Sequence, residues 1–77
     1  MPRGLLNWTF NDVVRFLKNK NFRLNHTQGS HYFYVGFIHN IPRQVCIQFH
    51  GRKSIRPKTM KSIIVQSGID KEEWFKK

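Results

Sequence analysis

Four histidines and a one-sided distribution of charge are the features of this sequence that could support chemistry. Between Val13 and Ile69 there are ten Lys or Arg residues and no Asp or Glu. Carboxylates hold Mg²⁺ or Mn²⁺ in two-metal nucleases, so this stretch lacks the ligands for such a centre. Histidine is then the natural proton carrier near neutral pH. If the protein cuts a nucleic acid, we expect it to do so without a metal or a cofactor.

His31 follows Gly29 and Ser30 at the start of the most apolar stretch of the chain, where a short turn can hold an imidazole at the rim of a sheet. One interpretation is a histidine that ends a strand and bonds to a backbone carbonyl. The other is a general acid or base. RNA makes the second interpretation economical, because its 2′-OH is an internal nucleophile. The protein must then supply only proton transfer and charge stabilisation at the phosphate.

His50 opens a polar, basic loop that leads into a predicted helix. The free N–H groups and the positive dipole end of a helix N-terminus favour phosphate. Around this terminus we expect one basic ridge, formed by Arg52, Lys53, Arg56, Lys58 and Lys61. Arg23 and the turn residue Gly29 are further candidates for RNA contact, and Ser30, His50 and Lys53 are auxiliary candidates at the catalytic site. The alternative for the loop is a solvated segment with a scattered histidine.

A zinc site and a membrane segment are both disfavoured. Cys46 and His50 are four residues apart on a predicted strand, hence roughly 13 Å apart at about 3.3 Å per residue, too far to share one ion. One cysteine cannot form an internal disulfide, which fits a reducing cytoplasm. We find no apolar run of signal-peptide or membrane-spanning length. A net charge of +10 instead calls for a polyanionic partner such as nucleic acid.

The pattern of apolar residues predicts one domain over residues 1–77, with its core at about 9–69. Thr9 and Asp12 resemble a capping box, and apolar positions from Phe10 to Leu17 have helical spacing up to a stop at Asn21. Period-two patterns predict strands near 22–25, 30–38 and 43–49. A helix from Pro57 to a stop at Gly68 and a short tail helix over 70–76 follow.

This order predicts an α+β sandwich with a helix, a three-stranded antiparallel sheet and a helix, in which both helices cover one sheet face. In the central strand we expect Phe33, Val35 and Phe37 to pack under the helices. Tyr32 and Tyr34 would then lie on the other surface, free to stack on bases, to fill that surface or to meet a protein partner.

Two blocks of the sequence carry a likeness to a known family. The first is Gly29-Ser30-His31 with an aromatic residue at Tyr34. The second is His50-x-x-Lys53-x-Ile55, continued by Thr59-Met60-Lys61-Ser62-Ile63 and Gln66-Ser67-Gly68-Ile69. With these blocks the chain resembles the HicA-type mRNA interferase toxins of bacterial and archaeal toxin–antitoxin pairs, over roughly residues 9–75. It departs from the family at Asn21 and Lys58, which are usually Gly, and at Ser67, which is usually Ala.

The resemblance implies a fold like the double-stranded RNA-binding domain, cleavage of mRNA through His31, and neutralisation by a HicB-type antitoxin. Lys58 would add charge at the proposed phosphate site. We therefore predict a cytoplasmic, metal-independent endoribonuclease with His31 as general acid/base. The alternative is a non-catalytic RNA-binding module of the same fold, which would recognise A-form shape through 2′-OH and phosphate contacts.

Overall fold

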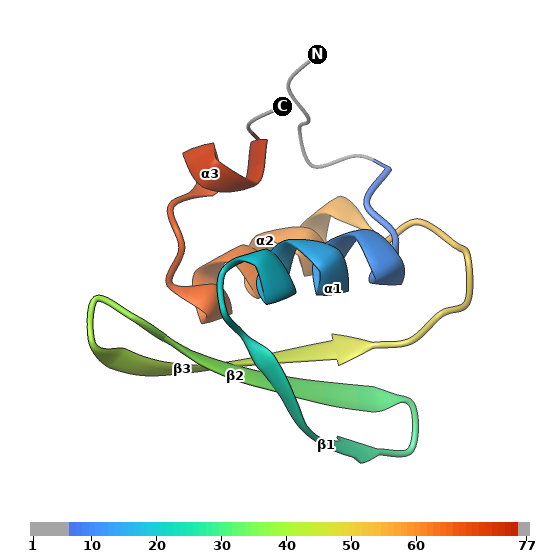
Figure 1. The fold of residues 1–77 in the computed structure, drawn as a ribbon. Helices are drawn as coiled ribbons and strands as arrows, with labels where there is room; N and C mark the ends of the chain where they lie inside the picture. Colours follow the sequence, from blue (N-terminus) through green and yellow to red (C-terminus); the bar gives the residue numbers. More distant parts are fainter. Residues whose placement is uncertain (1–6, 76–77) are drawn as a thin grey trace.

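A computed structural model describes residues 7–75 of the chain. Two helices lie on one face of a three-stranded sheet, and a third, short helix lies beyond them (Figure 1). The elements follow in the order α1 (Phe10–Asn19), β1 (Arg23–Gln28), β2 (His31–Ile38), β3 (Ile41–Gln48), α2 (Pro57–Ser67) and α3 (Lys71–Phe75). The predicted α+β arrangement is confirmed.

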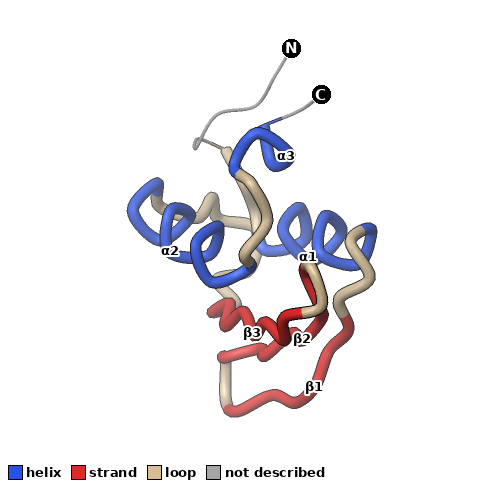
Figure 2. Tube along the Cα trace, turned by 90° about the vertical axis from the view of Figure 1, so that its left-hand side faces the viewer, coloured by secondary structure: helices blue, strands red, loops and turns tan. Residues whose placement is uncertain are grey.

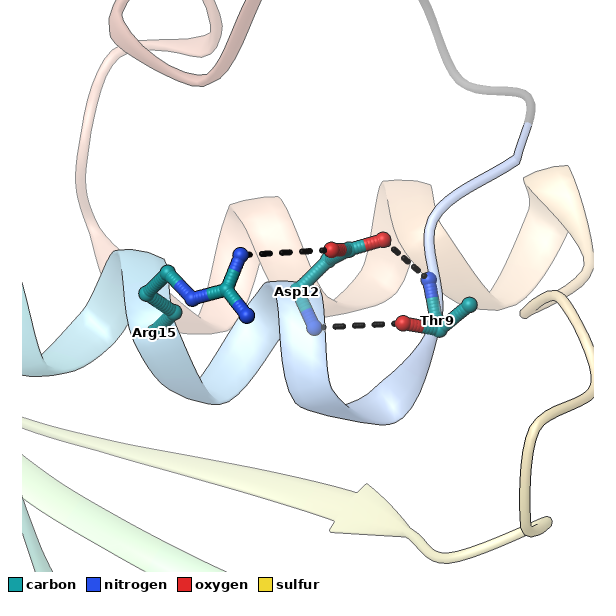
Figure 3. Close-up of polar contacts among 3 residues, drawn as sticks. All are labelled: Thr9, Asp12 and Arg15. Carbon is teal, nitrogen blue, oxygen red and sulfur yellow. Dashed lines mark hydrogen bonds and ion pairs between the residues drawn. The ribbon is translucent and has the colours of Figure 1, made fainter.

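The capping box predicted for α1 is present. The Asp12 backbone N–H donates to Thr9 Oγ1 at 3.2 Å, and the Thr9 backbone N–H donates to Asp12 Oδ2 at 3.1 Å (Figure 3). These bonds satisfy two groups that a helix start would otherwise leave unpaired. After the helix, Asn21 takes a φ of 69°, in the left-handed region that asparagine tolerates. Asn21 thus turns the chain after the helix, as the sequence predicted.

The sheet has the strand order β1-β2-β3, and both pairs are antiparallel. Two-residue loops join the strands: Gly29-Ser30 between Gln28 and His31, and His39-Asn40 between Ile38 and Ile41. His39 and Asn40 both have positive φ, as a type I′ hairpin turn requires. β1 extends to Gln28, further than predicted, because all six of its residues are exposed and give no alternating apolar pattern.

The register of β2 and β3 decides which side chains face the helices. Tyr32 pairs with Ile47 and Tyr34 with Val45, and directly paired residues point to the same face. Val45 and Ile47 are buried against the helices, so the two tyrosines lie on the helix-covered face as well. Tyr34 is only 4% exposed, and burial, followed by the nearby Tyr32, raises the pKa of its hydroxyl.

The predicted assignment of the two faces of β2 was therefore wrong. Phe33 and Val35 lie on the face turned away from α1 and α2, and Phe37, also assigned to the core, is 70% exposed. Both faces of β2 carry apolar or aromatic side chains. The sequence of this strand alone therefore does not show which face is turned toward the core. Pairing with the clear alternation of β3 supplies that signal.

The core lies between the sheet and the helical layer (Figure 2). Val13 and Leu17 of α1 and Met60 and Ile63 of α2 are almost completely buried over it. The side chain of Gln66 on α2 also reaches the edge of the sheet, where its Oε1 accepts a hydrogen bond of 3.0 Å from the Cys46 backbone N–H. This bond satisfies a donor on an edge strand and fixes α2 against β3.

The end of α2 and the position of α3 depend on a few close contacts. Gly68 ends α2 with a φ of 72°, and the buried Ser67 donates from Oγ to the Ile64 carbonyl at 2.7 Å. This bond satisfies the buried hydroxyl of Ser67. α3 is anchored by Trp74, whose ring stacks on Phe16 with centroids 4.0 Å apart and meets Trp8 edge-on at 5.4 Å. Such pairs stabilise beyond the area that they bury.

Candidate active site

His31 is the first residue of β2, and both neighbouring strands position it. It pairs with Gln28 of β1 across the two-residue turn and with Gln48 of β3 on its other side. The Phe49 backbone N–H also donates to the Ser30 carbonyl at 2.8 Å, which ties the turn to the end of β3. The His31 side chain is exposed. The backbone that carries this imidazole is thus fixed, and its ring remains accessible to a ligand.

The sequence alone left open on which sheet surface His31 lies. Because side chains alternate along a strand, His31 shares a surface with Phe33 and opposes the partly buried Tyr32 and the buried Tyr34. We call this surface, turned away from α1 and α2, the open face. By register its central residues are His26, Gln28, His31, Phe33, Cys46 and Gln48.

The turn before His31 is sterically open. Gly29 has a φ of 61°, and no heavy atom lies within 4 Å of where its Cβ would be. A two-residue hairpin needs a positive φ at this position, which glycine adopts without strain. The same missing side chain leaves room for a ligand backbone beside Ser30 and His31.

His50 lines a pocket of about 410 Å³ between the end of β3 and the start of α2. Its polar lining consists of Gln48, His50, Lys53, Ser54, Arg56 and Thr59. Gln48 also pairs with His31, so the pocket adjoins the strand pair that carries the candidate catalytic residue. In Figure 1 the β1–β2 turn, the end of β3 and the start of α2 all lie at the right-hand end of the molecule.

The N-terminus of α2 is suited to anions. Its N-cap residue, Arg56, makes no side-chain capping bond, and the first turn contains Pro57 and no acidic residue. The N-cap side chain thus leaves the backbone N–H groups of this turn uncapped, and the helix dipole gives this end partial positive charge. Lys53 and Arg56 line the adjacent pocket and add two full charges.

The Lys and Arg residues predicted to contact RNA do not all lie beside the pocket. Arg52, Lys58 and Lys61 are exposed around the same loop and helix but do not line the pocket. Arg23 is more remote, because it starts β1 and pairs with Val35, whereas His31 is opposite the other end of that strand. At about 3.3 Å per residue, the five steps from Arg23 to Gln28 place it roughly 16 Å along the strand from the turn.

Besides the histidines, Cys46 is a side chain on the open face that could take part in chemistry, as a nucleophile. It is a free thiol opposite Phe33, and burial raises its pKa. A thiol with a raised pKa stays protonated at neutral pH and is a poor nucleophile. Proton transfer on this face therefore falls to the histidines.

His26 was not among the residues that the sequence suggested for the site, yet its ring lies on the open face, stacked on Phe33 with centroids 4.4 Å apart. A β-bulge places it there, because the register of β1 against β2 shifts between Leu24 and His26. An extra residue in one strand leaves no recognisable pattern in a short polar sequence.

Among residues 7–75, no three His, Cys, Asp or Glu side chains are grouped so that they could hold a metal ion. Within the same part of the chain, no helix is long and apolar enough to cross a membrane.

Comparison with known protein families gives a match. The family model described as the HicA toxin of bacterial toxin–antitoxin systems matches residues 10–69, which includes both sequence blocks and every element from α1 to α2. The chain belongs to the HicA toxin family. No curated protein and no solved structure gives a significant match. For this HicA chain, the family match covers His31, the basic loop and the N-terminus of α2.

Proposed function

We propose that this HicA toxin is a metal-independent endoribonuclease that cleaves mRNA, with His31 as general acid/base. One observation carries the proposal: an exposed imidazole on a fixed turn stands at the end of the molecule where β3 runs into the basic loop and the start of α2. This arrangement supports the proposal, because proton transfer by His31 and phosphate binding at the start of α2, the two functions that RNA cleavage needs, would both occur at the same end of the molecule.

In the proposed reaction the 2′-OH of a ribose loses its proton to an imidazole and attacks the adjacent phosphorus. The bond from phosphorus to the 5′-oxygen breaks, and that oxygen takes up a proton. The products are a 2′,3′-cyclic phosphate and a 5′-hydroxyl end. Lys53, Arg56 and the N–H groups of α2 would bind phosphates of the RNA, and their positive charge would stabilise the transition state.

The remaining predicted residues take supporting roles in this proposal. Gly29 and Ser30 would let the RNA backbone approach the turn closely, and His50 would contact a phosphate from the pocket wall. Arg52, Lys58 and Lys61 would attract RNA without touching the scissile linkage. Arg23 is too far along β1 to share that linkage with His31 and would contact RNA only beyond it.

We further propose a HicB-type antitoxin as the protein partner, and the cytoplasm, where mRNA is translated, as the site of action. A chain with a net charge of +10 favours an acidic partner, and a partner that covers His31 would exclude RNA. Binding only to the folded toxin would also stabilise it by mass action. Co-expression with an acidic protein encoded beside the toxin should yield a complex of the two proteins and suppress toxicity.

His31→Ala tests the catalytic assignment. Incubated with mRNA in EDTA, the wild-type protein should cleave, and His31→Ala should lose activity by about 10²–10⁴-fold, the usual contribution of a positioned acid or base. Gel electrophoresis of the RNA and a binding assay measure the two effects separately. Because His31 is exposed, its loss should not unfold the protein.

His39→Asn is the matched control, since His39 is also exposed in a hairpin turn and asparagine tolerates its φ of 53°. It should cleave as the wild type does. Intact RNA with retained binding by the wild type would indicate the non-catalytic RNA-binding module instead. Cleavage only when divalent ions are supplied would contradict the metal-independent mechanism.

A further inference from the structure

His26 occupies a defined position on the open face. Its ring is nearly parallel to that of Phe33, with an interplanar angle of 6° and centroids 4.4 Å apart. The Nδ2 atom of Asn25 lies 2.9 Å from His26 Nδ1. The stack fixes the plane of the imidazole. The Asn25 amide donates to Nδ1 of the neutral ring, and it must turn away when the ring takes up a second proton. The other nitrogen, Nε2, is left to meet a ligand, because the side chain is exposed.

The β-bulge in β1 places His26 on this face. Leu24 pairs with Tyr34, whereas His26 pairs with Phe33, so Asn25 is an extra residue between them. In a regular strand Leu24 and His26 would point to the same side, and His26 would face the helices with Tyr34. The bulge turns it to the side of His31. Bulges re-aim side chains in this way next to active sites.

The same register places His26 near His31. Gln28 pairs with His31 and His26 pairs with Phe33, so the two histidines are diagonal neighbours on one face. Diagonal neighbours on adjacent strands are about 7–8 Å apart. A phosphodiester can lie in that interval with a hydrogen bond of about 2.6–3.2 Å to an imidazole on each side.

We propose that His26 is a second catalytic residue of this HicA chain, acting with His31 on one RNA linkage; this rests on the proposed function. One imidazole accepts the proton of the 2′-OH as the 2′-oxygen bonds to phosphorus. The other, as imidazolium, gives its proton to the 5′-oxygen as the bond from phosphorus to that oxygen breaks. Water then returns the pair to its starting protonation.

His26→Phe separates proton transfer from stacking. Phenylalanine keeps an aromatic ring against Phe33 and removes both nitrogens. RNA binding should stay within about twofold of the wild type, while cleavage falls by about 10²-fold or more. His39→Asn again controls for the loss of one exposed histidine and should be fully active. Wild-type cleavage by His26→Phe would overturn the inference.

The pH profile gives a readout that a structural role would not change. An essential base and an essential acid give a bell-shaped dependence of kcat/KM on pH, so the wild type should show two limbs and His26→Phe one. The other titratable groups facing the pair are Arg23 on β1 and Cys46 on β3, with His50 just beyond Gln48. His39→Asn removes a histidine that does not face the pair and should keep both limbs. A bell-shaped dependence of kcat/KM on pH that persists in His26→Phe contradicts the proposal.

An RNA with sulfur in place of the bridging 5′-oxygen assigns the roles, because a thiolate leaves without a proton. Only one of His26→Phe and His31→Ala should regain activity on it, namely the variant that lacks the acid; recovery by both or by neither contradicts the pair.

Failure of the inference and of the proposed function remain distinguishable. If His31→Ala is inactive and His26→Phe is not, only the inference fails, whereas an active His31→Ala removes the proposed function itself.

Discussion

At the scale of single residues, chemistry and conformation place different demands on the chain. The proposed role of His31 requires an exposed ring, and short backbone contacts to β1 and β3 fix this residue without burying its side chain. Gly68 has a purely conformational task. It ends α2 in the left-handed region and lies against the side chain of Arg43, whose Nε is buried without a hydrogen-bond partner among the described residues.

Gly68→Ala should lower the free energy of unfolding by more than backbone strain alone. An L-residue in this conformation costs roughly 1–2 kcal/mol, and the new Cβ would also meet Arg43, with its Cζ at 2.7 Å. Urea unfolding measures the loss. Gly51→Ala is the matched control, because Gly51 has a similar φ of 67° and no atom within 4 Å of its Cβ position. Equal losses in the two variants would show that Arg43 moves aside without cost.

At the scale of elements, local sequence signals were dependable for the helices and less so for the strands. α1 begins at its capping box and α2 at its proline, since these residues act through contacts a few positions away. The bounds of β1 and the face of β2 depend on pairing with other strands. Both were misjudged where a strand was uniformly exposed or apolar on both sides.

Thr9→Ala should destabilise the fold by about 1 kcal/mol, because the Asp12 N–H loses its acceptor at the start of α1. Thr9→Ser keeps the hydroxyl and should retain most of the stability. Thermal or urea unfolding of the three proteins gives the comparison. If serine is as damaging as alanine, the methyl group of Thr9 rather than its hydrogen bond holds the end of the helix.

At the scale of the whole molecule, the decisive property is charge. Ten cations without an acid between Val13 and Ile69 repel one another in the free protein, and an anionic partner relieves that repulsion. The four acids lie in or beside α1 and α3, away from the basic loop. One of them, Glu73, pairs with Lys20 at 2.9 Å, which links α3 to the end of α1.

RNA binding should therefore weaken steeply as salt rises between about 50 and 200 mM, because each phosphate contact releases a counterion. Lys53→Ala and Arg56→Ala should each reduce the slope of log K against log salt by about 0.7, the value per contact for a single strand. Fluorescence anisotropy at several salt concentrations measures it. Lys71→Ala on α3 is the control and should leave the slope unchanged. A flat response in the wild type would show that this basic surface does not bind RNA.

The sequence by itself determined the family, the helix ends and the candidacy of His31, because capping residues and the Gly29-Ser30-His31 block act over a few positions. Only the tertiary structure decided that Tyr34 is core and Phe33 is not, that Arg23 is remote from the basic loop, and that His26 shares a face with His31. These facts follow from strand register. A shift of one residue turns every side chain to the opposite face, and register is set by cross-strand pairing and a bulge that no local pattern encodes.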